Sequence, residues 1–304
     1  MIEAILVGAV RGGTSIVFAG VGEAVAERSG VVNLGTEGCM LAGALAAYAV
    51  GVETGSPWLG ALAGMAAGIL LAALHALIVI VRGANQIATG LAVTFLGIGA
   101  TALFGQTYVS QGVEPFTPWA VPGLSRLPLL GDVLFDHDPL TYVSFALVPA
   151  AWWFLFRSAR GLRIRAAGER PAVLASMGYD YRPVRWMAVT IGGALAGLGG
   201  AQLSTAFAKT WSENMVAGRG FIAVALVIFA AWNPYLVVVG AYLFSGAVAF
   251  ELELQARGTN VSIFLLDAIP YLVVVVVLAA MSPRRRHAAP ESLASAYHAA
   301  SAPT

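Results

Sequence analysis

Long apolar stretches separated by short polar segments run along almost the whole chain. A helix needs about 20 mostly apolar residues to cross the hydrocarbon core of a bilayer. Two stretches are weaker candidates: 2–22, which Arg11 interrupts, and 36–50, which is short. The apolar run 221–231 is too short to span alone and is either half of a broken helix or the end of a longer tilted one. The pattern predicts an all-α membrane protein with about eight or nine transmembrane helices. The clear candidates for spanning helices are 58–80, 84–105, 139–156, 186–205, 235–250 and 263–281.

Composition supports a membrane protein. Of 304 residues, 59% are hydrophobic and only 11% are charged, whereas a soluble domain carries roughly 25% charged residues. A net charge of +1 argues against a nucleic-acid binder, which would present a basic face. The single cysteine, Cys39, excludes an internal disulfide or a cysteine metal cluster. The first apolar stretch has no basic region before it and no cleavage site, so we expect a retained helix rather than a signal peptide.

Small residues recur at helical spacing in two of the apolar stretches. Gly60, Gly64 and Gly68 are four residues apart, and Gly193, Gly197 and Ala201 repeat this spacing later in the chain. Residues at this spacing share one helix face, and small side chains there let a neighbouring backbone approach closely. The pattern predicts tight helix packing and carries no information about a substrate.

The distribution of arginines predicts the orientation in the membrane, because cytoplasmic loops are enriched in basic residues. Loop 157–185 has seven arginines and two acidic residues, whereas loop 106–138 has one arginine and four acidic residues. We therefore expect the first loop in the cytoplasm and the second outside, with the N-terminus outside and the C-terminus inside. Residues 1–283 form the predicted transmembrane domain, and residues 284–304 a basic and then disordered cytoplasmic tail.

The densest cluster of polar residues in an apolar region lies at 22–38. Glu23 and Glu27 are four residues apart, hence on one helix face, and Arg28 is close enough to neutralise one of them. Four glycines in these seventeen residues break a continuous helix. One interpretation is a broken helix that lines a translocation path. The other is a cytoplasmic loop with Glu27 and Arg28 solvated and Glu37 near a helix N-terminus.

Further polar residues extend the list of candidates for the pathway. His75 lies in the middle of an apolar stretch, where we expect a hydrogen bond to a neighbouring helix rather than a proton relay. Asn85, Gln86 and Thr89 form a polar strip or cap the next helix. The candidate pathway residues are Glu23, Asn33, Thr36, Glu37, Asn85, Gln86, Glu213, Asn214 and Arg219.

The arginine-rich loop contains a predicted short helix. Pro171 suits its first position and Gly178 its C-terminal end. Small and apolar side chains between them form a partly apolar surface surrounded by charge, which favours docking to a cytosolic protein. The alternative is a basic loop that lies on anionic lipid headgroups.

Motifs of soluble enzymes are absent from the sequence. It contains no GxxxxGK[ST] loop for nucleotides, no HExxH motif and no CxxC pair. We therefore expect no enzymatic activity and no cofactor in this chain. A transporter without its own ATP site takes its energy from a gradient or from a partner.

Several segments resemble the permease subunits of ABC importers for simple sugars and nucleosides, in the superfamily that also includes branched-chain amino acid permeases. The shorter permease of nucleoside transporters is the most similar type. Cys39 stands where an aliphatic residue is expected. The segments that carry the resemblance are 22–38 with 40–44, 84–87, 161–163 with 167–169, 213–215 with 217–223, and 232–234.

The resemblance implies a type II ABC importer permease fold in the cell membrane, with residues 33–38 beside the central pathway. It implies three partners: an ATPase subunit that carries ATP and Mg²⁺, a second, longer permease that completes a heterodimer, and a substrate-binding lipoprotein or periplasmic binding protein. Loop 106–138 is a candidate contact for the binding protein. The coupling helix that seats in the ATPase would comprise Gly168, Glu169, Arg170, Pro171, Ala172, Leu174, Ala175, Met177 and Gly178.

The function that follows is import of nucleosides, with simple sugars second, by alternating access. The alternative is a gradient-driven secondary transporter of a small polar solute. Such a transporter has an ion site at mid-membrane within inverted repeats. The sequence shows no convincing internal repeat, and only His75 and Glu23 are candidates for such a site.

Overall fold

The computed structural model describes residues 1–258, 262–280 and 289–293, and these are mostly helical. Two π-helical turns, η1 (Leu77–Val81) and η4 (Leu203–Phe207), continue α3 and α9, and two 3₁₀ turns are η2 (Gln106–Tyr108) and η3 (Leu124–Arg126). Strands β1 (Trp119–Ala120) and β2 (Asp136–His137) pair antiparallel. The helices are α1 (Ile2–Arg28), α2 (Thr36–Thr54), α3 (Pro57–Ala76), α4 (Gln86–Gly105), α5 (Leu130–Leu134), α6 (Pro139–Arg157), α7 (Ala159–Glu169), α8 (Pro171–Ser176), α9 (Tyr181–Gln202), α10 (Arg219–Phe229), α11 (Pro234–Ala256) and α12 (Ile263–Ala280).

Within the described residues, six helices are long and apolar enough to cross a membrane. The sequence predicted about eight or nine crossings. The difference lies in α2, α10 and α12. Helix α2 carries a glutamate near each end, and α10 has only 11 residues. In α12 the stretch Phe264–Val276 counts only as a shorter apolar helix. The six are Ile2–Arg28, Pro57–Val81, Gln86–Tyr108, Pro139–Arg157, Tyr181–Phe207 and Pro234–Ala256.

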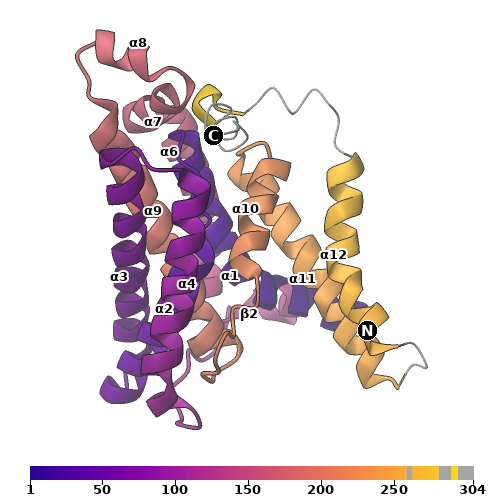
Figure 1. The fold of residues 1–304 in the computed structure, drawn as a ribbon. Coiled ribbons are helices and arrows are strands. Elements are labelled where there is room, and N and C mark those ends of the chain that lie inside the picture. Colours follow the sequence, from indigo (N-terminus) through magenta and orange to yellow (C-terminus); the bar gives the residue numbers. More distant parts are fainter. Residues whose placement is uncertain (259–261, 281–288, 294–304) are drawn as a thin grey trace.

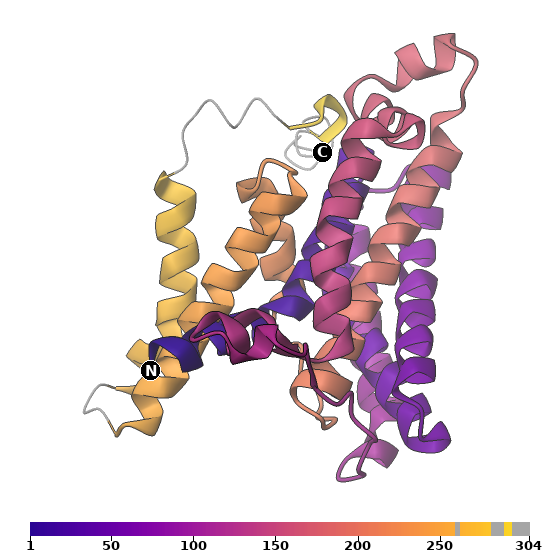
Figure 2. The same ribbon diagram turned by 180° about the vertical axis from the view of Figure 1, so that it is seen from behind.

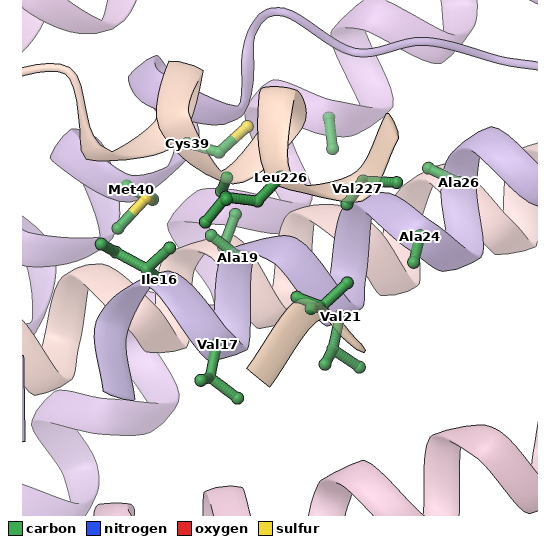
Figure 3. Close-up of a cluster of buried hydrophobic side chains, with 14 of the residues drawn as sticks. Ile16, Val17, Ala19, Val21, Ala24, Ala26, Cys39, Met40, Leu226 and Val227 are labelled. Carbon is green, nitrogen blue, oxygen red and sulfur yellow. The ribbon is translucent and has the colours of Figure 1, made fainter. Parts of the chain in front are cut away.

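Helix α1 occupies the centre of the molecule. It packs against α9 on one side and against α10 and α11 on another, so it joins the bundle of α2, α3, α4 and α9 to the group of α10, α11 and α12 (Figure 1). Its apolar side chains meet Met40 of α2 and Leu226 and Val227 of α10 in one buried cluster (Figure 3). Arg11 does not interrupt this helix, because its Nη2 donates a hydrogen bond to the carbonyl oxygen of Asp136 at 3.2 Å.

Glycines allow the helices of the bundle to approach one another closely. A Cβ atom added to Gly68 of α3 would overlap the carbonyl oxygen of Gly193 in α9, and one added to Gly197 would overlap that of Gly64. A Cβ atom on Gly200 would likewise overlap the carbonyl oxygen of Met40 in α2. The expected role of the small residues in packing is confirmed, since these helices meet backbone to backbone.

Loop 106–138 folds into a small hairpin at the end of the molecule opposite α8 (Figure 2). Trp119 of β1 pairs with His137 of β2. The His137 ring is fully buried, its Nε2 donates to the carbonyl oxygen of Val133 at 2.7 Å, and burial lowers its pKa. The Tyr142 hydroxyl of α6 donates to the carbonyl oxygen of Trp119 at 2.9 Å, so the hairpin is attached to the helices.

Residues 289–293 near the C-terminus are ordered and lie at the same end as α7 and α8 (Figure 1). Leu293 is only 1% exposed within the core. Ser292 accepts a hydrogen bond from Arg185 Nη2 at 3.1 Å, and Glu291 forms an ion pair with Arg170 at 3.2 Å. The expectation of a disordered tail is wrong for this segment, because Leu293 finds an apolar site. Residues 284–288 and 294–304 lie outside the described residues.

Substitution of Gly68 tests the close helix contact. Gly68→Ala places a methyl group against the backbone of α9, and we expect it to lower the free energy of unfolding by about 1–3 kcal/mol. Gly99→Ala in α4 is the control, because a Cβ atom there meets no atom within 4 Å. Thermal unfolding of both variants in the same detergent measures the difference. Equal melting temperatures for the two variants would contradict the assigned contact.

Candidate functional site

The turn between α1 and α2, residues 29–35, is organised around the buried carboxylate of Glu23. Its Oε1 accepts a hydrogen bond from the backbone N–H of Asn33 at 2.8 Å, and its Oε2 accepts one from the hydroxyl of Thr36 at 2.9 Å. Asn33 Oδ1 in turn accepts from the N–H of Gly35 at 3.0 Å. Non-helical backbone away from water needs such partners, so these side chains replace the missing helical hydrogen bonds.

Side chains of α3 and α4 bind the other side of the same turn. Gln86 accepts from the N–H of Val32 at 2.8 Å. His75 Nε2 donates to the carbonyl oxygen of Val32 at 3.0 Å, and Thr94 donates to that of Leu34 at 2.9 Å. His75 was expected to bond to a neighbouring helix, and its partner is instead the α1–α2 turn. Side chains of α1, α3 and α4 thus bind this turn from different directions.

The carboxylate of Glu37 reaches from the first turn of α2 to the beginning of α10. Its two oxygens accept hydrogen bonds from the N–H groups of Gly218 and Gly220, each at 2.7 Å. The first N–H groups of a helix lack partners within the helix, and the helix dipole favours a negative charge there. Gly218 has a φ of +84°, a conformation that suits glycine. Glu37 therefore caps α10 rather than its own helix.

Arg219 and Phe207 adjoin this cap. Arg219 Nη1 donates to the carbonyl oxygen of Gly12 in α1 at 2.9 Å, and its guanidinium lies 5.5 Å from the centre of the Phe207 ring. A guanidinium at this distance interacts favourably with an aromatic face. The start of α10 is consequently bonded to α1 through Arg219 and to α2 through Glu37.

Glu27 and Arg28 do not form the expected ion pair. The Trp232 indole donates to Glu27 Oε2 at 2.5 Å, whereas Arg28 Nη2 donates to the carbonyl oxygen of Ala231 at 3.1 Å. The Arg28 guanidinium also lies 5.5 Å from the Phe156 ring centre, so aromatic and backbone partners take the place of the carboxylate. The alternative of a solvated Glu27 is wrong, since this side chain is fully buried.

The structure brings together part of the predicted pathway set. Glu23, Asn33, Thr36 and Gln86 surround the α1–α2 turn, and Glu37 and Arg219 adjoin it at α10. The other members lie elsewhere, because Asn85 caps α4 through the N–H of Ala88 at 3.0 Å, and Glu213 and Asn214 are exposed. The role of the set in translocation stays a prediction. Trp232, the buried partner of Glu27, was not in it.

The arginine-rich loop contains the predicted short helix with different limits. Pro171 begins α8, and Gly178 follows its end with a φ of +81°. Gly168 and Glu169, expected in the coupling helix, instead end α7. The cause is Arg170, whose extended backbone (φ −145°, ψ 84°) is the conformation favoured before a proline.

Helix α8 presents an apolar surface at the end of the molecule. Leu174 is 3% exposed and attaches the helix to its neighbours, whereas Val173 is 51% and Met177 68% exposed. Ala172 and Ala175 are exposed as well. Val173 was missing from the predicted set, although its position between Ala172 and Leu174 was visible in the sequence.

Arg185 in the first turns of α9 links three segments near α8. Its Nε donates to the carbonyl oxygen of Ser29 at 3.0 Å, and its Nη2 donates to that of Ala167 at 3.0 Å and to the Ser292 hydroxyl at 3.1 Å. It thereby connects the α1–α2 turn to α7 and to the C-terminal segment. No spacing distinguishes Arg185 from the other six arginines of the loop, so sequence reasoning did not single it out.

Among the described residues, no group of three or more His, Cys, Asp or Glu side chains could hold a metal ion. The buried carboxylates of Glu23 and Glu37 are instead bonded to backbone N–H groups. The arrangement supports and positions backbone segments.

Replacement of Glu37 tests the cap on α10. Glu37→Gln offers one acceptor oxygen where two N–H groups need partners, so we expect a loss of about 1–3 kcal/mol of stability. We also expect faster hydrogen exchange at residues 218–222. Glu213→Gln, an exposed change in the same loop, is the control. Exchange rates at 218–222 that match those of the control would refute the cap.

Comparison with known proteins identifies the family. The family described as branched-chain amino acid transport system, permease component, matches residues 5–281. The "Putative glucose ABC transporter permease protein TsgC13" of Haloferax volcanii is 43% identical over 251 residues, 81% of this chain and 76% of the relative. The guanosine ABC transporter permease protein NupQ of Bacillus subtilis is 35% identical, with 82% of this chain and 81% of the relative covered. The nucleoside ABC transporter permease protein NupC of Lactococcus lactis is 32% identical, with 88% of each chain covered.

No solved structure matches the chain significantly. The family match over residues 5–281 includes both the α1–α2 turn and α8. Proteins of this family work with an ATPase and a binding protein. The chain belongs to the branched-chain amino acid type of ABC permeases, and it is a multi-pass membrane permease subunit of an ABC importer.

Proposed function

We propose that this permease imports nucleosides, with simple sugars as the second candidate. Relatives named for guanosine and for nucleosides support the first choice over 82% and 88% of the chain. The relative at 43% identity that is named for glucose favours the second. Both candidates contain a sugar ring with several hydroxyl groups, so the two readings share the same recognition chemistry.

The observation that supports an ATP-driven mode of import is the exposed apolar surface of α8, formed by Val173 and Met177. An exposed apolar patch surrounded by charge is typical of a docking site for another protein. We place the ATPase subunit on this surface. ATP and Mg²⁺ bind to that partner, and this chain itself carries out no chemistry.

The orientation follows from the charges near α8. Seven arginines in loop 157–185 support a cytoplasmic position for this end and for the C-terminus. The hairpin of β1 and β2 then lies outside the cell membrane, where it is available to a substrate-binding protein. A second, longer permease completes the translocation unit as a heterodimer.

Movement of α8 reaches the membrane helices through α7 and Arg185. Arg185 bonds both to Ala167 of α7 and to Ser29 of the α1–α2 turn, so a displacement of α7 acts on the turn. We infer that the turn forms part of the wall of the pathway. In alternating access, ATP binding at the partner would shift this wall and open the pathway to one side at a time.

An uptake measurement tests the transport mode. We expect vesicles that contain this chain, the second permease, the ATPase and the binding protein to accumulate radiolabelled guanosine only when ATP is present. Parallel vesicles tested with radiolabelled glucose distinguish the second candidate. Accumulation driven by a proton or sodium gradient without the ATPase would favour a gradient-driven secondary transporter instead.

Charge placed on α8 tests the docking surface. Val173→Asp and Met177→Asp put carboxylates on exposed apolar positions, so we expect the fold to persist while the affinity for the ATPase falls at least about tenfold. Val109→Asp is the matched control, because Val109 is 50% exposed but lies in loop 106–138. A pull-down of the ATPase subunit with each variant measures the association. Unchanged association of both α8 variants would remove the ATPase from this surface.

A further inference from the structure

An open groove of about 560 Å³ lies at the end of the molecule opposite α8. This volume falls within the range of roughly 300–1,000 Å³ that is usual for small-molecule sites. Its lining combines charged, apolar and aromatic side chains from three parts of the chain. The residues that carry the argument are Glu3 and Arg11 of α1, Asp132 of α5 and Phe207 of η4.

The charged groups of the groove are of both signs. The carboxyl groups of Glu3 and Asp132 interact directly with each other, and both side chains are exposed. Arg11 is half-buried and uses one of its donors for the carbonyl oxygen of Asp136 at 3.2 Å. A guanidinium has five N–H donors and a carboxylate only acceptors, so the groove offers both kinds of hydrogen-bonding partner.

Phe207 contributes the aromatic surface. The ring is 41% exposed and packs on α1, where a Cβ atom on Gly12 would lie 3.6 Å from it. The Arg219 guanidinium lies 5.5 Å from the ring centre. Contacts to α1 and to Arg219 therefore support the ring while part of it faces the groove.

The combination of groups selects among ligand classes. Two carboxylates disfavour an anionic solute, and the nearby Arg11 disfavours a metal cation, which takes six or more oxygen ligands in the case of calcium. A neutral ring with many hydroxyl groups matches all of the features. Its hydroxyls donate to the carboxylates and accept from Arg11, and its apolar or aromatic face packs on Phe207.

We propose that this groove is the site where the permease receives a neutral, hydroxyl-rich solute with a sugar ring, bound by Glu3, Asp132, Arg11 and Phe207. The inference rests on the proposed function for its solute class, and it adds a site and named contacts. Nucleosides and simple sugars share the recognised ring, and the aromatic contact is larger for a nucleoside because a base stacks on a phenyl ring.

The surroundings of the groove connect it to the interior. Phe207 contacts Arg219, and Arg219 is the first residue of α10, whose beginning is capped by Glu37 of α2. A solute on Phe207 therefore lies one side chain away from the segment that joins α10 to the α1–α2 turn. This position suits the first binding site of a pathway that continues between α10 and the α1–α2 turn.

The test compares groove variants with a matched control in the complete transporter. Asp132→Asn and Phe207→Ala each remove one proposed contact, whereas Glu114→Gln removes a negative charge from an exposed site in the same loop but outside the groove. We expect the KM for guanosine uptake to rise about tenfold in both groove variants. Glu114→Gln should leave the KM, the basal ATPase rate and the melting temperature of the parent protein unchanged, and Asp132→Asn should keep that melting temperature because its side chain is exposed.

The outcomes separate the inference from the proposed function. Failure of the unmodified transporter to take up guanosine or glucose with ATP would refute the proposed function. Normal uptake by the unmodified transporter with an unchanged KM in both groove variants would refute the site alone. A loss of binding-protein or second-permease association in the variants would show a protein interface instead, and it would also overturn the solute site. Glucose uptake alone, with the same rise in KM, supports the site for a sugar.

Discussion

The structure depends on supplying partners to backbone N–H and C=O groups where a helix stops inside an apolar environment. An unpaired peptide group there costs several kcal/mol, about as much as the net contribution of several ordinary hydrogen bonds. The α1–α2 turn and the start of α10 are the two places where this problem is concentrated. Glu23 solves it for the turn and Glu37 for the helix start, each with both carboxylate oxygens in use. The burial of Glu23 and Glu37 is therefore explained by the backbone that they stabilise, and their presence alone does not define a site for solute or ions.

These hydrogen bonds require the helices to be close together. A carboxylate on α2 reaches the beginning of α10 because Gly220 has no side chain, and a Cβ atom there would lie 2.5 Å from the Cα atom of Glu37. In the same way, Gly68 and Gly193 let α3 and α9 meet backbone to backbone. Lipid offers little hydrophobic driving force for helix association, so close packing and interhelical hydrogen bonds provide it. The glycines thus allow the close helix approach that the hydrogen bonds of the buried carboxylates require.

Sequence reasoning found the features that follow from local rules. The limits of α8 are set by Pro171 and Gly178, the packing faces by glycines at every fourth position, and the family by segments spread along the chain. It failed where several partners compete for one side chain. Arg28 was assigned to a nearby glutamate but bonds to a carbonyl group and aromatic rings, and the tail was predicted to be disordered although Leu293 is buried. Such choices depend on residues more than a hundred positions away, which spacing does not reveal.

For the site, the sequence located the α1–α2 turn, but it missed Arg185, Trp232 and the groove at Phe207, because each of these acts through the tertiary fold.

The proposed docking surface and the proposed solute groove lie at opposite ends of the molecule, so transport requires a physical connection between them. A continuous series of contacts exists. Arg185 joins α7 to the α1–α2 turn, the turn leads directly into α2, and Glu37 of α2 caps α10, whose Arg219 contacts Phe207 in the groove. Contiguity alone does not establish coupling, which needs an element with two arrangements that both ends bias. The turn is the element best suited to this role. Its hydrogen bonds come from side chains on α1, α3, α4 and α9 rather than from a regular helix, so these bonds can be exchanged individually when α7 moves, whereas the glycine-packed helices around it must move as a unit.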